Sequence, residues 1–175
     1  WMTLHASLDG GRLVLTQGRL TLREQLPQDA AQLADGKPAG LRWIDEVPGE
    51  GTIGAASMTV AAAAAGLYRP GWGVFAIQRT LDGTALGGAG FHGPPDAGAV
   101  EIGYDLSASG RGAGWATDAA RALCQWALGQ PEVDMVLATT EPANSASQAV
   151  LTRVGFRRVA DRGELWAYEL RRLPT

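Results

Sequence analysis

A glycine-rich loop at residues 110–116 is the segment whose composition most directly predicts chemistry. Its sequence, Gly-Arg-Gly-Ala-Gly-Trp-Ala, lies between a run that alternates like a strand and a run spaced like an amphipathic helix. A helix N-terminus leaves backbone N–H groups unpaired and carries a partial positive charge. Glycine lets the backbone approach an anion closely and adopt a positive φ. The loop therefore predicts a turn that cradles a pyrophosphate, although a flexible strand–helix connection would have the same composition.

Two other glycine-rich phosphate motifs do not fit this loop. A Walker loop needs a lysine followed by Ser or Thr, and Lys37 is the only lysine of the chain. The dinucleotide fingerprint needs a third glycine three residues after the second, where Trp115 or Thr117 stands instead. The preceding runs also predict a meander rather than a βαβ unit. The sequence therefore argues against nucleotide kinases and dehydrogenases.

Few side chains could hold zinc or form a cysteine–histidine pair. Cys124 is the only cysteine, so no disulfide can form within the chain, and His5 and His92 are the only histidines. A zinc cluster or a Cys–His dyad would need that one thiol to meet a distant imidazole, so no metal site is expected. The net charge of −3 argues against nucleic acid as a partner. It suits a cationic acceptor, but an ordinary acidic soluble protein is the simpler interpretation.

The length of the chain predicts one globular domain over residues 1–175. Its 46% of hydrophobic and 19% of charged residues are typical of a chain that folds without disulfides. No apolar run approaches the roughly 18–20 residues that span a bilayer. The N-terminus lacks the basic region and apolar core of a signal peptide, so a cytoplasmic protein is expected. Trp1 precedes Met2 and is expected to be an added residue, and the excess of Arg over Lys is typical of a GC-rich bacterial genome.

Hydrophobic spacing and turn residues predict a mixed α+β fold. Strands are expected at residues 13–23 with a break near Gly18, and at 73–79, 85–91, 100–106, 135–139, 156–160 and 165–170. The short turns within 73–106 indicate an antiparallel meander. Helices are expected at 27–33, 53–67, 116–127 and 145–154. The last helix would begin with Asn144 or Ser145 as N-cap and end at Gly155.

The loop and two further segments resemble those of a known family. Residues 111–116 resemble the coenzyme A loop, (Q/R)-x-x-G-x-(G/A), of the GNAT N-acyltransferases. Residues 100–106, VEIGYDL, resemble the fourth strand of that family. Residues 144–156, NSASQAVLTRVGF, resemble the N-x-x-S…GF helix of its ribosomal-protein N-terminal acetyltransferase branch, the RimJ/RimL type. The three segments have the family's order and spacing, and the order of elements is similar over residues 10–172.

This resemblance implies a central, mostly antiparallel sheet of about seven strands, flanked by about four helices. The fourth and fifth strands would splay apart, and the pantetheine arm of the coenzyme would pair with backbone in the gap. An N–H near Leu106 would hold the thioester oxygen as negative charge develops. The residues that the resemblance assigns to coenzyme binding are Tyr104, Asp105, Leu106, Arg111, Gly112, Ala113, Gly114, Trp115, Ala116, Asn144 and Ser147.

Glu101 is the carboxylate that the resemblance implies as general base. It lies on the strand face opposite Val100 and Ile102, where many relatives carry a carboxylate. Acyl transfer needs a neutral amine, and a free α-amine has a pKa of about 7.7–8.0, a lysine amine about 10.4. Asp105 and Glu141 are alternative bases, and a chain of waters is another route for the proton. A solvated strand glutamate without a catalytic role is the structural alternative.

Ser147 matches the serine of the branch, and the resemblance implies that it donates to the departing thiolate. Many GNAT enzymes use a tyrosine four residues before the glycine of the final Gly-Phe, but here that position is Leu151. A helix-terminus serine is the structural alternative for Ser147. A pure N-cap is the structural alternative for Asn144.

The loop around Trp43 and Glu46 lies where the family's acceptors enter, so these two residues are predicted to contact a cationic amine. An anchoring role for Trp43 is equally consistent with the sequence. His92 is interpreted as a turn residue beside Gly93, and Cys124 as a small buried apolar group within a helix.

The sequence thus predicts an enzyme, an acetyl-CoA-dependent N-acyltransferase that needs no metal and acts on a primary amine of a protein N-terminus or a small molecule. It is expected to be a monomer or homodimer with no nucleic acid or membrane partner. A non-catalytic acyl-CoA sensor on the same fold is one alternative, because the family's tyrosine is missing. An unrelated α+β interaction domain is another. The acceptor amine and the acyl group, acetyl or succinyl, stay open.

Overall fold

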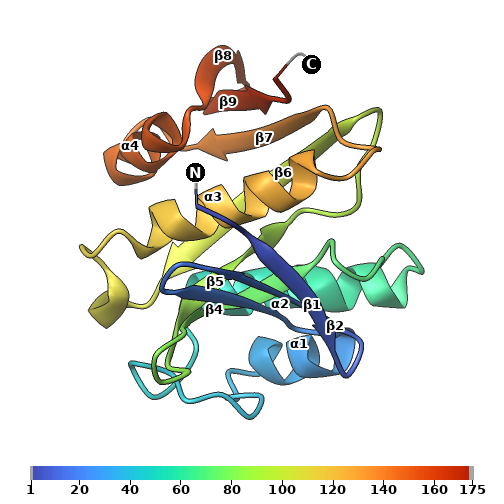
Figure 1. The fold of residues 1–175 in the computed structure, drawn as a ribbon, viewed down its shortest axis with the longest axis vertical. Helices are drawn as coiled ribbons and strands as arrows, with labels where there is room; N and C mark the ends of the chain where they lie inside the picture. Colours follow the sequence, from blue (N-terminus) through green and yellow to red (C-terminus); the bar gives the residue numbers. More distant parts are fainter. Residues whose placement is uncertain (1, 174–175) are drawn as a thin grey trace.

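A nine-stranded sheet forms the centre of the computed structural model, which describes residues 2–173 (Figure 1). The strands are β1 (His5–Asp9), β2 (Arg12–Gln17), β3 (Leu20–Glu24), β4 (Val74–Arg79), β5 (Ala85–Phe91), β6 (Ala99–Leu106), β7 (Met135–Thr140), β8 (Arg157–Arg162) and β9 (Leu165–Arg171). Their order across the sheet is β1-β2-β3-β4-β5-β6-β7-β9-β8. Neighbouring strands are antiparallel except β6 and β7, which are parallel. Trp1, expected to be an added residue, lies outside the described residues.

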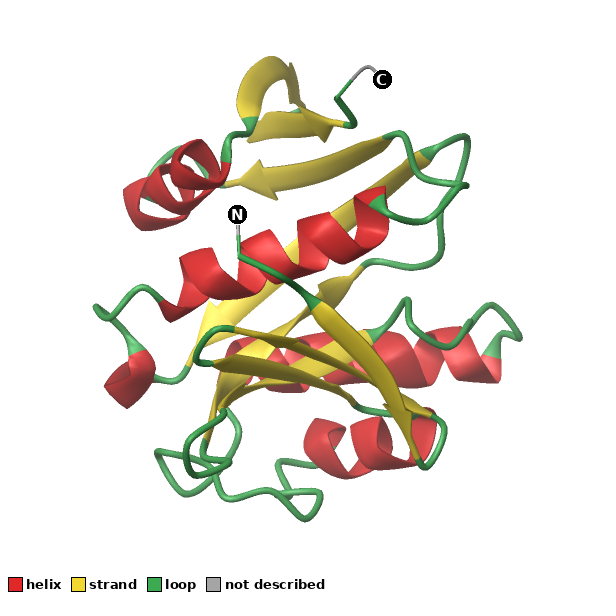
Figure 2. Ribbon diagram, viewed as in Figure 1, coloured by secondary structure: helices red, strands yellow, loops and turns green. Residues whose placement is uncertain are grey.

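Four α-helices in the described part of the chain cover the two faces of the sheet (Figure 2). They are α1 (Pro27–Ala34), α2 (Glu50–Ala64), α3 (Trp115–Leu128) and α4 (Ser145–Val154), and a 3-10 turn, η1 (Ala108–Gly110), precedes α3. Helix α1 packs on α2, and α2 packs on β4, β5 and β6. Helix α3 packs on β3, β6 and β7, with α4 beside it. No helix within residues 2–173 is long and apolar enough to cross a membrane.

The sheet separates two apolar cores. Successive residues of a strand point to opposite faces, and β4 illustrates the consequence. Val74 and Ala76 pack in a cluster with Leu33 of α1. Phe75 and Ile77 pack in the other cluster, which contains the buried stripe of α3. The apolar stripe predicted for residues 116–127 is therefore the face of α3 that lies on the sheet.

The predicted α+β class is confirmed, but the expected number of about seven strands is wrong. Residues 13–23 lie in two strands, β2 and β3, which turn near Gly18 and pair with each other. Strand β1 was not predicted, because all five of its residues are exposed and no alternation marks a buried face. Its pairing with β2 places it in the sheet. Helix α2 also begins and ends three residues before its predicted bounds of 53–67, and the chain turns away at Gly66, where φ is 72°.

Candidate active site

Strands β6 and β7 are paired at one end only. Their parallel ladder ends at Glu101, which lies beside Leu137, and beyond it the strands diverge (Figure 1). The N–H of His92 donates to the carbonyl of Glu101 (2.9 Å), so the backbone groups of Glu101 face β5. Backbone groups alternate in direction along an antiparallel strand. Those of Ile102 and Tyr104 therefore face the divergence, where an extended ligand can pair with them.

A cleft of about 680 Å³ occupies this divergence and reaches the start of α3. Most residues predicted to bind the coenzyme line it: Tyr104, Asp105, Leu106, Arg111, Gly112, Gly114, Ala116, Asn144 and Ser147. The other two lie beside it in the loop, Ala113 exposed and Trp115 buried. Gly114 is the N-cap of α3 with φ of 84°, a conformation that other residues rarely adopt. The first turn of a helix and the guanidinium of Arg111 thus share one wall, a setting suited to phosphate.

Arg19, from the turn between β2 and β3, holds the glycine loop from outside. Its guanidinium donates to the carbonyl of Ala113 (2.6 Å) and to the carboxylate of Asp118 (2.8 Å). It also stacks on Trp115, 3.8 Å from the ring centroid. These contacts join a distant turn to the loop and to the first turn of α3, so they fix the loop's position relative to the cleft.

A second contact holds η1, which leads into the glycine loop. Asp45 accepts hydrogen bonds from both the hydroxyl and the backbone N–H of Ser109. The hydroxyl bond is the main reason that the pKa of Asp45 lies below its ordinary value. Arg111 in turn donates to the carbonyl of Leu106 at the end of β6 (3.1 Å). The loop is thus tied to the 40–50 segment and to the sheet.

We expect Arg19→Ala to raise the dissociation constant for acetyl-CoA about tenfold, or about 1.4 kcal/mol, because the loop loses its outer support. Thermal stability should change little, since exposed ion pairs contribute at most about 1 kcal/mol. Titration calorimetry with acetyl-CoA measures the first effect and a thermal melt the second. Arg79→Ala is the matched control, because Arg79 pairs with Asp82 in the exposed turn between β4 and β5. Equal affinities for the parent and Arg19→Ala would show that Arg19 does not position the loop.

Tyr104 and Ser147 meet across the cleft. The phenol oxygen lies 2.8 Å from the hydroxyl oxygen of Ser147, in the first turn of α4. Burial raises the pKa of Tyr104 to about 12, so the phenol keeps its proton near neutral pH and can donate it. Asn144 accepts the N–H of Ser147 (3.1 Å) and is the N-cap of α4, as predicted. Leu151, at the position of the family's tyrosine, is fully buried.

Glu101 lies beside an imidazole that the sequence interpretation treated as a turn residue. Nδ1 of His92, just after β5, lies 3.1 Å from Oε2 of Glu101 on β6. The hydroxyl of Thr139 on β7 donates to the same oxygen (3.3 Å). The hydrogen bond from His92 is the largest cause that holds the pKa of Glu101 below its ordinary value. Glu101 is therefore a carboxylate in a polar group built from three adjacent strands.

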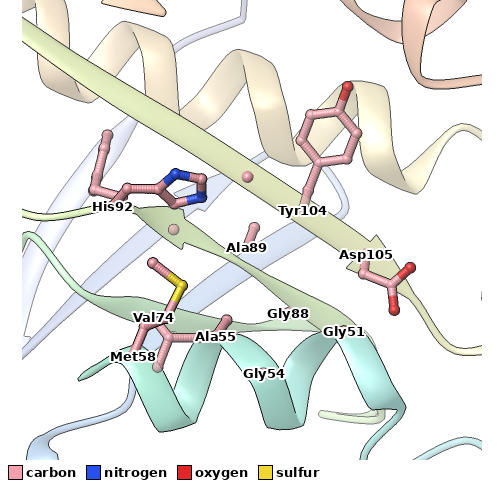
Figure 3. A pocket seen from close by; sticks show the side chains of 13 residues that line it. Gly51, Gly54, Ala55, Met58, Val74, Gly88, Ala89, His92, Tyr104 and Asp105 are labelled. Carbon is pink, nitrogen blue, oxygen red and sulfur yellow. The ribbon is translucent and has the colours of Figure 1, made fainter. Parts of the chain in front are cut away.

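A cavity of about 230 Å³ adjoins the cleft on the α2 side of the sheet (Figure 3). Small residues of α2 and β5 form much of its wall, and Met58 lies at its edge. Tyr104 and Asp105 line both this cavity and the coenzyme cleft, and they project to opposite sides of β6. His92 lines the cavity over Gly103. A group bound in the cavity would thus reach the cleft beside the end of β6.

The other predicted residues, Trp43, Glu46 and Glu141, line neither of these two cavities. Trp43 is buried, packs against α1 and α2, and donates through its ring N–H to the carbonyl of Pro38 (3.1 Å), which supports the anchoring role. Glu46 is exposed in the same loop. Glu141, the third possible base, is exposed just after β7, and its carbonyl accepts from Gln148. Among residues 2–173, no three His, Cys, Asp or Glu side chains gather closely enough to hold a metal ion.

The sequence interpretation missed the contacts of His92 and of the Tyr104 hydroxyl. His92 follows β5 directly, and a short connection leads from it to β6. Pairing the two predicted strands as a hairpin would have placed His92 opposite Glu101, so the register of the strands could have predicted this contact. No local pattern links Tyr104 to Ser147, since α4 brings them together.

Comparison with protein families gives a match over most of the chain. The profile of the acetyltransferase (GNAT) domain matches residues 19–157. A Bacillus subtilis protein named as an uncharacterized N-acetyltransferase, YjdG, is 40% identical over 72 residues. That alignment covers 41% of this chain and 43% of the B. subtilis protein, less than half of its length.

Solved structures share the fold. An acetyltransferase from Agrobacterium tumefaciens superposes with a TM-score of 0.64 at 24% identity, covering 97% of this chain and 98% of that one. RimJ of Mycobacterium smegmatis, solved in complex with CoA-disulfide, gives a TM-score of 0.62 at 20% identity. That superposition covers 96% of this chain and 86% of RimJ. At these identities the likeness concerns the fold alone.

Proposed function

We propose, from the premise that this chain belongs to the GNAT acetyltransferase domain family, that it is an acetyl-CoA-dependent N-acyltransferase. It transfers an acetyl-type group to a primary amine by direct attack on the thioester. The observation that carries the proposal is the junction of two cavities at Tyr104 and Asp105. One cavity reaches the glycine loop at the start of α3, and the other is lined by the carboxylate of Asp105 and the imidazole of His92.

The coenzyme occupies the cleft between β6 and β7 in this proposal. Its pyrophosphate lies on the N–H groups of residues 111–116, and its pantetheine arm pairs with the backbone of Tyr104 and Leu106. The thioester lies at the end of the arm away from the pyrophosphate. The N–H of Ile102, which faces the divergence like that of Tyr104, therefore holds the thioester oxygen as charge develops, rather than an N–H near Leu106. Asn144 and Ser147 border the coenzyme from α4.

The acceptor amine enters from the α2 side. Glu101 and His92 lie there to receive a proton, and Glu46 and Trp43 shape the outer loop. The amine nitrogen attacks the thioester carbonyl carbon, and the carbon–sulfur bond breaks. The thiolate takes the phenol proton of Tyr104, with Ser147 hydrogen-bonded to the same oxygen. The amide nitrogen loses its surplus proton, which restores the phenol.

Acetyl-CoA is expected to raise the melting temperature, because a ligand that binds only the native state stabilises it by mass action. At about 100 times the dissociation constant the stabilisation is about 2.7 kcal/mol. For a chain of this size that corresponds to roughly 5–10 °C. A thermal melt with and without millimolar acetyl-CoA measures the shift. Acetyl-pantetheine, which lacks the pyrophosphate and the nucleotide, is the control.

Activity is tested by release of free thiol with a panel of amines. The panel contains a peptide with a free serine N-terminus, spermidine, kanamycin and phenylalanine amide. Thiol release with at least one amine supports the enzyme. Coenzyme binding without thiol release from any of them would favour the acyl-CoA sensor. Absence of both effects would favour an unrelated interaction domain.

A further inference from the structure

The imidazole of His92 is held in one orientation by two strands. Its Nδ1 lies 3.1 Å from Oε2 of Glu101, and its backbone N–H donates to the carbonyl of Glu101 (2.9 Å). Thr139 fixes the same carboxylate oxygen from β7. A carboxylate accepts only, so Nδ1 carries the proton of a neutral imidazole and Nε2 keeps its lone pair. The contact therefore selects the tautomer whose free nitrogen can accept a proton.

The free nitrogen lies over a glycine at the wall of the cavity. A Cβ added to Gly103 would lie 2.8 Å from Nε2 of His92, so the imidazole occupies the space that a side chain would fill. The glycine lets the ring lie close to β6. The same ring borders a second hollow of about 70 Å³, lined also by Tyr68 and Arg69, on the side towards the loop before β4. The side chain is 40% exposed, so a proton taken from the cavity can pass to solvent.

The carboxylate and the imidazole differ in how well they suit proton removal. The neighbouring imidazole holds the pKa of Glu101 below its ordinary value, which weakens that carboxylate as a base. Acceptor amines have pKa values of about 7.7–10.4, far above that range. A general base works best when its pKa lies near the operating pH, so the lowered pKa of Glu101 moves that carboxylate further from this range.

From this geometry we infer that His92 is the general base of the proposed acyl transfer, with Glu101 as its positioning residue. The inference rests on the proposed function. Nε2 of His92 takes one proton from the acceptor ammonium and passes it to solvent. The nitrogen lone pair that is set free attacks the thioester carbonyl carbon. Tyr104 gives its phenol proton to the departing sulfur, and the second proton lost by the nitrogen returns to Tyr104. The products are therefore the amide, the thiol and one released proton.

Other ionisable groups border His92 and enter the pH dependence. Glu101 touches it from β6, and Asp105 and Tyr104 line the same cavity. Tyr68 and Arg69 line the second hollow. The facing residues of α2, Met58 and Thr59, carry no charge. Arg162 acts on Glu101 through its charge. Of these groups only Glu101 contacts the imidazole directly, so its replacement is the sharpest probe.

The test compares pH–rate profiles of the full chain with the most reactive amine of the panel. His92→Gln is expected to lower kcat/KM about 100-fold at pH 7, within the range typical of general-base catalysis. The loss should shrink as the pH passes the pKa of the amine, because neutral amine is then abundant. Glu101→Gln should keep the acid limb and lower kcat/KM less than His92→Gln does, because the amide oxygen of glutamine can still accept the Nδ1 proton. His5→Gln, which changes the other histidine on exposed β1, should leave the profile unchanged.

The thermal shift produced by acetyl-CoA is the second measurement, and it should match the parent in every variant. That match shows that the fold and the coenzyme site are intact. A parental pH profile in His92→Gln would overturn the inference and leave the proposed function standing. An acid limb that is lost in Glu101→Gln but kept in His92→Gln would assign the base to Glu101 instead. A parent that releases no thiol with any amine would overturn both the proposed function and the inference.

Discussion

Replacement of Gly114 by valine is expected to raise the dissociation constant for acetyl-CoA at least about 100-fold. Gly114 has φ of 84°, which a β-branched residue adopts only under strain. Its Cβ would also lie 3.4 Å from the guanidinium of Arg19 that holds the loop. The valine would occupy part of the cleft wall where the proposed pyrophosphate binds. Loss of two charge-assisted hydrogen bonds, about 1.5–3 kcal/mol each, covers the roughly 2.7 kcal/mol that a 100-fold change requires.

Titration calorimetry with acetyl-CoA measures this change, and Gly163→Val is the matched control. Gly163 also has a left-handed backbone, with φ of 61°, but lies in the turn between β8 and β9. Both variants should lose similar melting temperature from backbone strain, and only Gly114→Val should lose affinity. Parental affinity in a folded Gly114→Val protein would show that the glycine loop does not hold the phosphates.

The fold follows from sequence wherever local signals agree with packing. Helix α4 is an example, because Asn144 caps its start and Gly155, with φ of 112°, ends it. Strands β5 and β6 also lie close to their predicted bounds, since turn residues separate two apolar runs. Strand β1 has no such signal, because its five exposed residues depend on pairing with β2 alone.

In the candidate site too, some contacts follow from local sequence signals and others depend on tertiary packing. The residues assigned to coenzyme binding cluster in two short segments, so one loop and one helix start suffice to predict most of that wall of the cleft. The contact between His92 and Glu101 depends on the register of β5 against β6, which the sequence interpretation did not derive. The contact between Tyr104 and Ser147 depends on where α4 packs, and no spacing rule gives that position. Both pairs arise from tertiary structure.

Tyr104→Phe is expected to lower kcat about 100-fold while the KM for acetyl-CoA stays within about threefold of the parent, because the phenol proton is needed only when the thiolate departs. Phenylalanine keeps the ring that packs against the core, and Ser147 can hydrogen-bond water instead, so folding should be nearly unaffected. Steady-state kinetics with the most reactive amine separate kcat from KM. A thermal melt checks the fold, and Tyr168→Phe, a buried tyrosine of β9, is the matched control.

The roles of Tyr104 and Ser147 can be distinguished by making Ser147→Ala alone and together with Tyr104→Phe. If the serine only orients the phenol, Ser147→Ala should lose less activity than Tyr104→Phe, and the double variant should be no slower than Tyr104→Phe alone. If the serine passes the proton to sulfur itself, both single variants and the double variant should fall to the same rate. Losses that multiply would mean that the two hydroxyls act independently.

Because burial raises the pKa of Tyr104 to about 12, the phenol stays protonated up to about pH 10, so no alkaline decline in rate below that pH should come from this residue. A decline near pH 8 that disappears in Tyr104→Phe would contradict its role as a buried proton donor.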